Sequence, residues 1–162
     1  TLACEESRVK VVAIDKSPGA LQVAQHNAET HQCQNRVDFC EGAGLQPVKS
    51  HRQRYHIIIS NPPYVSSLAK GLVDLSVSQY EPEAAVFSGK SGHEAYLELF
   101  EQSGEVLHPE GRLVIELGGE NTSDVLRLAE KAGWGPEEVR KDLSGKDRCA
   151  ILKLAQEMKS LF

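Results

Sequence analysis

The chain has 162 residues, a length that suits one domain and allows a sizeable core. Hydrophobic residues make up 40% of it and charged residues 25%, as in an ordinary globular protein, and the net charge is −5. That charge disfavours non-specific binding to nucleic acid or to an anionic membrane surface. No apolar run reaches membrane-spanning length and no secretory signal opens the chain, so no membrane segment is expected.

Cysteine and histidine positions indicate neither a disulfide framework nor a metal site. The four cysteines, at positions 4, 33, 40 and 149, include no Cys-x-x-Cys pair, and the six histidines form no metal-like pair. Reduced cysteines are typical of a cytoplasmic protein, with the mitochondrial matrix as the alternative. The chain begins at Thr1 without a methionine, and we interpret it as part of a longer protein.

The first half of the chain predicts strands that end at polar residues. A β-branched run at 8–14 is typical of a buried parallel strand and ends at Asp15. Ser17 and Pro18 then predict the N-cap and first position of a helix that runs to about His31. Further elements are a strand near 37–39, a loop at 42–44 and the clearest strand of the chain, at 56–60, which stops at Asn61.

The second half continues the alternation of strands and helices. Residues 65–90 have little periodicity and a length at which a loop is usually functional or disordered. Such alternation predicts an α/β fold with a mostly parallel sheet, and two closing strands predict an antiparallel C-terminal edge. The elements expected after residue 90 are a helix at 92–107, a turn at 109–111, a strand at 112–117, a helix at 121–132 and strands at 138–141 and 149–154.

The loop Asn61-Pro62-Pro63-Tyr64 is the most specific chemical feature of the sequence. Its prolines have no backbone N–H, so it displays acceptors and almost no donors, and the residue before each proline is held extended. The Asn61 side-chain oxygen and the Pro62 carbonyl would suit a substrate nitrogen with two N–H donors, aimed at a methyl donor. Tyr64 would add a flat wall for a planar amide or base. The alternative is a strand that ends in an ordinary Asn-Pro turn.

Asp15 also follows the carboxyl end of a predicted strand, the edge at which ligands bind in parallel sheets. An acid there commonly accepts hydrogen bonds from the ribose hydroxyls of a nucleotide-like cofactor. The alternative is a solvated carboxylate that interacts favourably with the dipole of the following helix. Because Asn61 is expected at the same edge of the sheet, we favour the cofactor interpretation.

These features together resemble the HemK/PrmC family, which methylates the side-chain nitrogen of a glutamine in peptide-chain release factors. The resemblance implies a Rossmann-like S-adenosylmethionine methyltransferase sheet with S-adenosylmethionine as cofactor. It implies that Asp15 holds the cofactor ribose and that Asn61 approaches the cofactor. It also implies that Asn61 and Pro62 orient the substrate amide and that Tyr64 packs against that amide. The resemblance runs from about Leu2 to Leu154, through Val11 to Asp15, Asn27-Ala28, Ile57 to Tyr64, Tyr80-Glu81-Pro82, Ala84-Ala85, Gly89, Glu116-Leu117-Gly118 and Asp147-Arg148.

Two departures from the family pattern matter. The glycine-rich loop that cradles the cofactor, the first strand and the N-terminal helical domain would all precede Thr1, so residues 1–162 are interpreted as the C-terminal part of a single catalytic domain. The position expected to carry an acid beside the adenine falls near Ala43, whose side chain accepts no hydrogen bond. We expect these residues alone to bind the cofactor weakly or not at all, because the neighbours of an absent strand keep unpaired backbone groups, each costing roughly 1–3 kcal/mol if buried.

Three functions stay open at this point. The resemblance implies methylation of the glutamine in the Gly-Gly-Gln loop of a release factor, which would be the protein partner. The Asn-Pro-Pro-Tyr string alone is shared with DNA adenine and ribosomal RNA methyltransferases, so N-methylation of an exocyclic amino group of a base is the alternative. The net charge of −5 makes a nucleic-acid partner the weaker expectation. A non-catalytic remnant that binds a partner through residues 65–90 is the third hypothesis.

Overall fold

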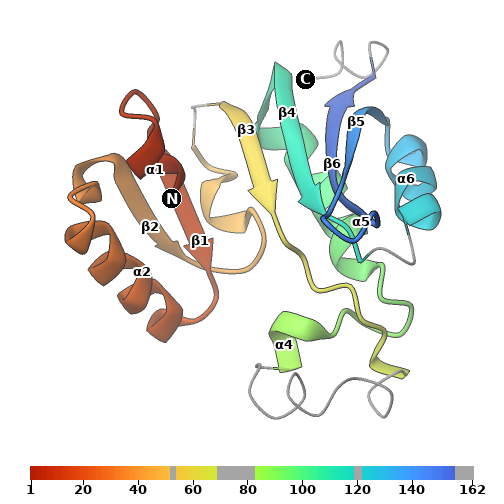
Figure 1. The fold of residues 1–162 in the computed structure, drawn as a ribbon, viewed down its shortest axis with the longest axis horizontal. Coiled ribbons are helices and arrows are strands. Elements are labelled where there is room, and N and C mark those ends of the chain that lie inside the picture. Colours follow the sequence, from red (N-terminus) through yellow and green to blue (C-terminus); the bar gives the residue numbers. More distant parts are fainter. Residues whose placement is uncertain (52–53, 69–82, 119–121, 156–162) are drawn as a thin grey trace. The chain divides into compact units, whose positions relative to one another are not determined.

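The computed structural model describes residues 1–51, 54–68, 83–118 and 122–155. They belong to two compact units, residues 1–50 and residues 51–162 (Figure 1). None of the helices in the described ranges is long and apolar enough to cross a membrane. The motif Tyr80-Glu81-Pro82 lies outside the described residues.

The first unit is a two-stranded parallel sheet with a helix packed against it. β1 and β2 are in register from Val11 opposite Val37 to Asp15 opposite Glu41, and α2 connects them and contacts both (Figure 1). Because the strands are parallel and in register, their carboxyl ends lie at the same edge. The elements are α1 (Leu2–Glu5), β1 (Val11–Asp15), α2 (Pro18–Thr30), η1 (Gln34–Arg36), β2 (Val37–Glu41) and η2 (Gln46–Val48).

The start of this unit differs from the sequence prediction. A short helix, α1, precedes the strand, and β1 begins at Val11 rather than at Arg8. A local turn explains the later start, because the Glu6 carboxylate accepts hydrogen bonds from the Arg8 backbone N–H at 3.0 Å and from the Arg8 guanidinium at 2.8 Å. The β-branched run therefore becomes a strand only beyond this turn.

The predicted helix α2 is confirmed at both ends. Pro18 is its first residue, and the Ser17 hydroxyl accepts a hydrogen bond from the Ala20 N–H at 3.3 Å, as expected of an N-cap. The helix ends at Thr30, one residue before His31.

The second unit is a four-stranded sheet in the order β3-β4-β6-β5 (Figure 1). β3 and β4 are parallel, whereas β6 is antiparallel to both β4 and β5. The antiparallel C-terminal edge and the α/β class that the sequence predicts are therefore confirmed. The elements are β3 (Tyr55–Ser60), α4 (Glu83–Val86), α5 (Glu94–Val106), β4 (Leu107–Glu116), α6 (Thr122–Lys131), β5 (Trp134–Lys141) and β6 (Asp147–Leu154).

The core of this unit lies between the sheet and the helices α5 and α6 (Figure 1). Leu113 and Ile115 near the end of β4, and Leu117 just after it, alternate along the chain and are fully buried, as expected of side chains on one face of a strand. Trp134, at the start of β5, is 1% exposed, and its indole N–H donates to the Phe100 carbonyl of α5 at 3.1 Å. This contact joins the far edge of the sheet to the helix layer.

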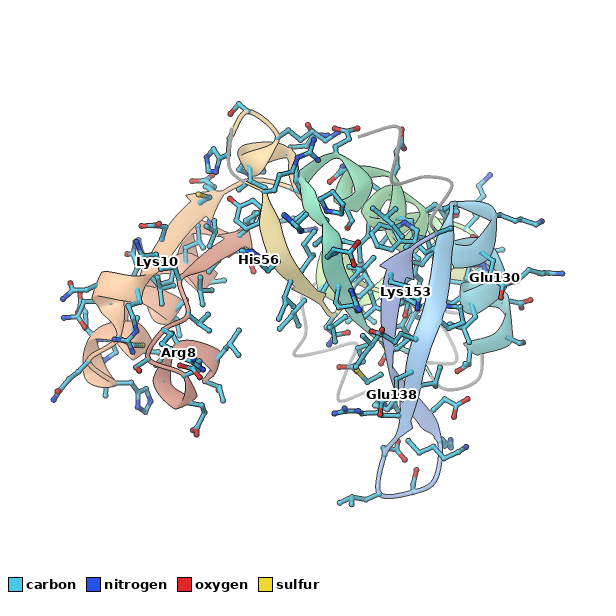
Figure 2. All side chains as sticks on the ribbon, turned by 90° about the horizontal axis from the view of Figure 1, so that it is seen from above. Arg8, Lys10, His56, Glu130, Glu138 and Lys153 are labelled. Atoms are coloured by element: carbon cyan, nitrogen blue, oxygen red, sulfur yellow. The ribbon has the colours of Figure 1, made fainter. Side chains whose placement is uncertain are left out.

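Helix α6 follows the amphipathic pattern of its sequence. Val125 and Ala129, one helical turn apart, are buried, whereas Glu130 is exposed (Figure 2). The helix ends at Lys131, and Gly133 follows it with a φ angle of 84° that favours glycine, while the Gly133 N–H donates to the Glu130 carbonyl at 3.0 Å.

Two predictions for this sheet are wrong. Residues 109–111 are not a turn between helix and strand, because β4 starts at Leu107 directly after α5 and accommodates the bend as a register shift against β3. β5 starts at Trp134 rather than at 138, although Gly135 and Pro136 disfavour strands. Pro136 is tolerated because β5 is an edge strand of this sheet, where a missing N–H removes no inner ladder bond.

Candidate active site

The loop at 61–64 continues from the carboxyl end of β3 without regular structure, as its two prolines predict. Asn61 is exposed and Pro62 is buried. Within the described residues, no hydrogen bond engages the Asn61 side chain or the Pro62 carbonyl, the two acceptors that the sequence singles out.

A pocket of about 230 Å³ opens beside Asn61. It lies where β3 and β4 end and the antiparallel β6 begins. Ligands of α/β sheets bind at the carboxyl ends of parallel strands, so Asn61 lies where such a ligand would be expected. The lining residues are Ile59, Ser60, Asn61, Val114, Ile115, Glu116, Arg148 and Cys149.

The Tyr64 ring packs against the backbone at Gly118, and the residue after Tyr64 is fixed by backbone hydrogen bonds. The ring lies directly on Gly118: a Cβ atom added to that glycine would be only 2.8 Å from Tyr64 Cδ2. The next residue, Val65, donates its N–H to the Val86 carbonyl at 3.1 Å and accepts from the Ser88 N–H at 2.9 Å. The 61–64 loop is therefore anchored at its far end as well as at β3.

Tyr96 of α5 supports the same region from the core, and the sequence analysis did not single it out. It is 1% exposed, and its hydroxyl donates to the Glu116 carbonyl at 2.8 Å. Burial raises the pKa of the Tyr96 hydroxyl well above its usual range, and the neighbouring Tyr64 and Glu116 raise it further. The hydroxyl therefore stays protonated and keeps its donor role at the end of β4. Its position in an apolar helix pattern carries no signal of this contact.

Arg148 is a second residue that the sequence did not place in the site. It lines the pocket, and its guanidinium donates to the Leu117 carbonyl at 2.9 Å and to the Asp142 carboxylate at 3.2 Å. The Leu117 N–H in turn donates to the Arg148 carbonyl at 2.9 Å. Arg148 thus fixes the segment that follows β4 and brings a positive charge to the pocket. Its only signal in the sequence is its place beside Asp147 in the family resemblance.

In the first unit, Asp15 and Ala43 lie at the same edge of the two-stranded sheet, and both are exposed. The Asp15 carbonyl accepts from the Gly42 N–H at 3.0 Å, which ties the end of β1 to the loop that contains Ala43. Asp15 Oδ1 accepts from the Ser17 N–H at 2.8 Å, and Oδ2 has no partner in the described part of the chain. Asp15 and Asn61 belong to different units, so their predicted proximity stays a prediction.

Among the known proteins that resemble this chain in sequence are methyltransferases. Residues 1–77 match the family model of the methyltransferase small domain. The chain is 38% identical over 145 residues to the release factor glutamine methyltransferase of Enterococcus faecalis, and the match covers 88% of this chain and 50% of that protein. The chain spans about half the length of the release factor glutamine methyltransferases that it matches.

Solved structures of low sequence identity share the fold. A methyltransferase from Pyrococcus furiosus has a TM-score of 0.65 and 18% identity, over 94% of this chain and 66% of that one. A Streptococcus mutans protein solved in complex with SAH has a TM-score of 0.57 and 17% identity, over 90% of this chain and 76% of that one. The chain is therefore similar over most of its length to release factor glutamine methyltransferases, and it shares the Rossmann-like fold of the methyltransferases of known structure.

Proposed function

We propose that the protein methylates the side-chain amide nitrogen of the glutamine in the Gly-Gly-Gln loop of a peptide-chain release factor, with S-adenosylmethionine as the methyl donor. The observation that carries this proposal is that Asn61, whose side chain has no hydrogen-bond partner among the described residues, lines a pocket at the carboxyl ends of β3 and β4. The 38% identity to a release factor glutamine methyltransferase supports this substrate over others.

In this proposal the 61–64 loop binds and orients the amide. A primary amide presents two N–H donors on one nitrogen, and the Asn61 side-chain oxygen and the Pro62 carbonyl each accept one of them. S-adenosylmethionine supplies a methyl group on a sulfonium, a good leaving group, so orientation of the nitrogen supplies much of the rate. The Tyr64 ring restricts the planar amide to one plane. As the N–C bond forms, the bond from the methyl carbon to sulfur breaks and leaves a neutral thioether. The nitrogen releases one proton, for which the exposed Asn61 leaves a path to solvent.

The residues at the edge of the first unit fit the cofactor in part. Asp15 is exposed and its Oδ2 is free among the described residues, so the carboxylate can accept from ribose hydroxyls while Oδ1 stays on Ser17. Ala43 offers only backbone groups to an adenine. We propose that residues 1–162 are the C-terminal part of the catalytic domain, and that preceding residues supply the glycine-rich loop, the first strand and a helical domain. The half-length match to the relatives supports this division.

The proposed partner is the release factor itself, and the proposed compartment is the bacterial cytoplasm, with the mitochondrial matrix as the alternative. The bacterial sources of the related release factor glutamine methyltransferases support the first compartment.

A radiolabelled methyl-transfer assay with the full-length natural protein tests the substrate class. We expect label in a release factor with an intact Gly-Gly-Gln loop, none in the same factor when its loop glutamine is replaced by alanine, and none in RNA or DNA. Label in nucleic acid instead would replace the proposal by amino-methylation of a base. No label in any substrate would favour a non-catalytic, partner-binding role.

A further inference from the structure

Gly118 lies under the Tyr64 ring so closely that a side chain would not fit. An added Cβ atom would be 2.8 Å from Tyr64 Cδ2, 3.2 Å from Cε2 and 3.3 Å from Cγ. Ordinary contacts between carbon atoms are about 3.5–4.0 Å. An alanine at this position would therefore push the ring away by roughly 1 Å, the shortfall from ordinary contact.

The backbone that leads to Gly118 is held by hydrogen bonds. The preceding residue, Leu117, exchanges hydrogen bonds of 2.9 Å with Arg148 through both its N–H and its carbonyl. Glu116, one residue earlier, is held by the buried Tyr96 hydroxyl at 2.8 Å. The displacement caused by a side chain at Gly118 would therefore fall mainly on the Tyr64 ring.

The backbone of Tyr64 is confined from another direction by a second glycine. A Cβ atom at Gly92 would be 2.8 Å from the Tyr64 carbonyl oxygen and 3.0 Å from the Ser66 backbone nitrogen. Gly92 also has a φ of 81°, so a substitution there would strain the backbone as well. Gly118 has no positive φ, and alanine at that position tests the ring contact alone.

We propose that Gly118 is a positioning residue for methyl transfer: it sets the height of the Tyr64 ring and so the width of the slot that holds the planar substrate amide beside Asn61. This inference rests on the proposed function and deepens it. A misplacement of about 1 Å at a reacting group can cost about 10²-fold in rate. A methyl group at Gly118 would move the Tyr64 ring without contacting the substrate, so its effect on the methylation rate would report the position of the ring.

Gly118→Ala and Gly135→Ala make a matched pair in the full-length natural protein. Gly135 has no atom within 4 Å of an added Cβ and no positive φ, so its variant carries the same methyl group without a clash. We expect Gly118→Ala to lower kcat for release factor methylation roughly 10- to 100-fold and Gly135→Ala to leave it unchanged. Equal rates for the two variants, in a preparation whose wild type methylates release factor, would overturn the inference and leave the proposed function intact.

A double-mutant cycle with Tyr64→Ala separates positioning from a general structural role. If Gly118 acts through the ring, Gly118→Ala should cost almost nothing once the ring is removed, because the two changes share one contact. Binding of a Gly-Gly-Gln peptide, measured by calorimetry, should follow the same non-additive pattern. A further loss in the double variant overturns the proposal. Should Gly118→Ala fold poorly, the comparison of Tyr64→Ala with the double variant still decides, since the added methyl group then has space.

Discussion

Asn61 and Arg148 line the same pocket but are held differently. The Asn61 side chain has no partner among the described residues, whereas Arg148 is held by Asp142 and by the Leu117 carbonyl. The role of Asn61 is predictable from the sequence, because the prolines that follow it remove N–H donors and hold the loop extended. Arg148 and Tyr96 are not predictable in the same way, because their roles depend on contacts with residues 20 to 31 positions away.

The hydrogen bond from the Tyr96 hydroxyl to the Glu116 carbonyl stabilises the end of β4 beside the pocket, and its contribution can be measured. We expect Tyr96→Phe to lower the free energy of unfolding by about 1–3 kcal/mol, because it leaves the Glu116 carbonyl without its buried donor. Urea unfolding of the two proteins measures this difference. A free energy of unfolding that Tyr96→Phe leaves unchanged would contradict the assigned role of Tyr96.

At the scale of elements, the carboxyl ends of strands are more predictable than their starts. β1 and β3 end where β-branched runs meet Asp15 and Asn61, and the cap at Ser17 fixes the start of α2. The start of β5 is hidden because Gly135 and Pro136 disfavour strands in general but are tolerated at the edge of a sheet. The sequence predicts the antiparallel C-terminal edge, but Gly135 and Pro136 hide how early its outermost strand begins.

The contribution of the turn between β5 and β6 to the stability of the fold should depend on pH, because the turn contains the Asp142 carboxylate. Hydrogen bonds from the Ser144 hydroxyl, from the backbone of Lys146 and Ser144, and from Arg148 lower the pKa of Asp142 to about 2, below its usual 3.8. Since the folded-state pKa is the lower one, the stabilisation is complete above about pH 4 and is lost as the pH falls towards about 2.

The variant Asp142→Asn measures this effect. The difference in unfolding free energy between wild type and Asp142→Asn should be largest near about pH 6 and should shrink below about pH 4. A difference that stays constant from about pH 6 to about pH 2.5 would show that the carboxylate charge has no part in the turn.

At the scale of the whole molecule, the predicted site residues Asp15 and Asn61 belong to different units. Asp15 lies at the sheet edge of the first unit and Asn61 at that of the second, and the sequence predicts that one continuous sheet joins them. The described strands form two hydrogen-bonded sheets, of two and four strands. Alternating patterns predict the strands of each sheet but not the starts of β1, β4 and β5, and a strand that joins the two sheets stays a proposal.

Cofactor binding tests this division. We expect calorimetric titration of residues 1–162 with S-adenosylmethionine to show weak binding or none, because the glycine-rich loop and the joining strand are proposed to precede them. The full-length natural protein should bind it clearly under the same conditions. A micromolar affinity of residues 1–162 alone would contradict the proposed division of the domain.

The central claim is that the 61–64 loop holds the NH2 group of a glutamine through Asn61 and Pro62. Its most direct test is tandem mass spectrometry of a release factor incubated with S-adenosylmethionine and the full-length natural protein, either wild type or Asn61→Ala. The account predicts one methyl group on the loop glutamine with wild type. With Asn61→Ala it predicts roughly 10²-fold slower transfer and an unchanged melting temperature, because Asn61 is exposed and unpaired in the described structure. Methylation at an unchanged rate by Asn61→Ala, or a methyl group on any other residue, would contradict it.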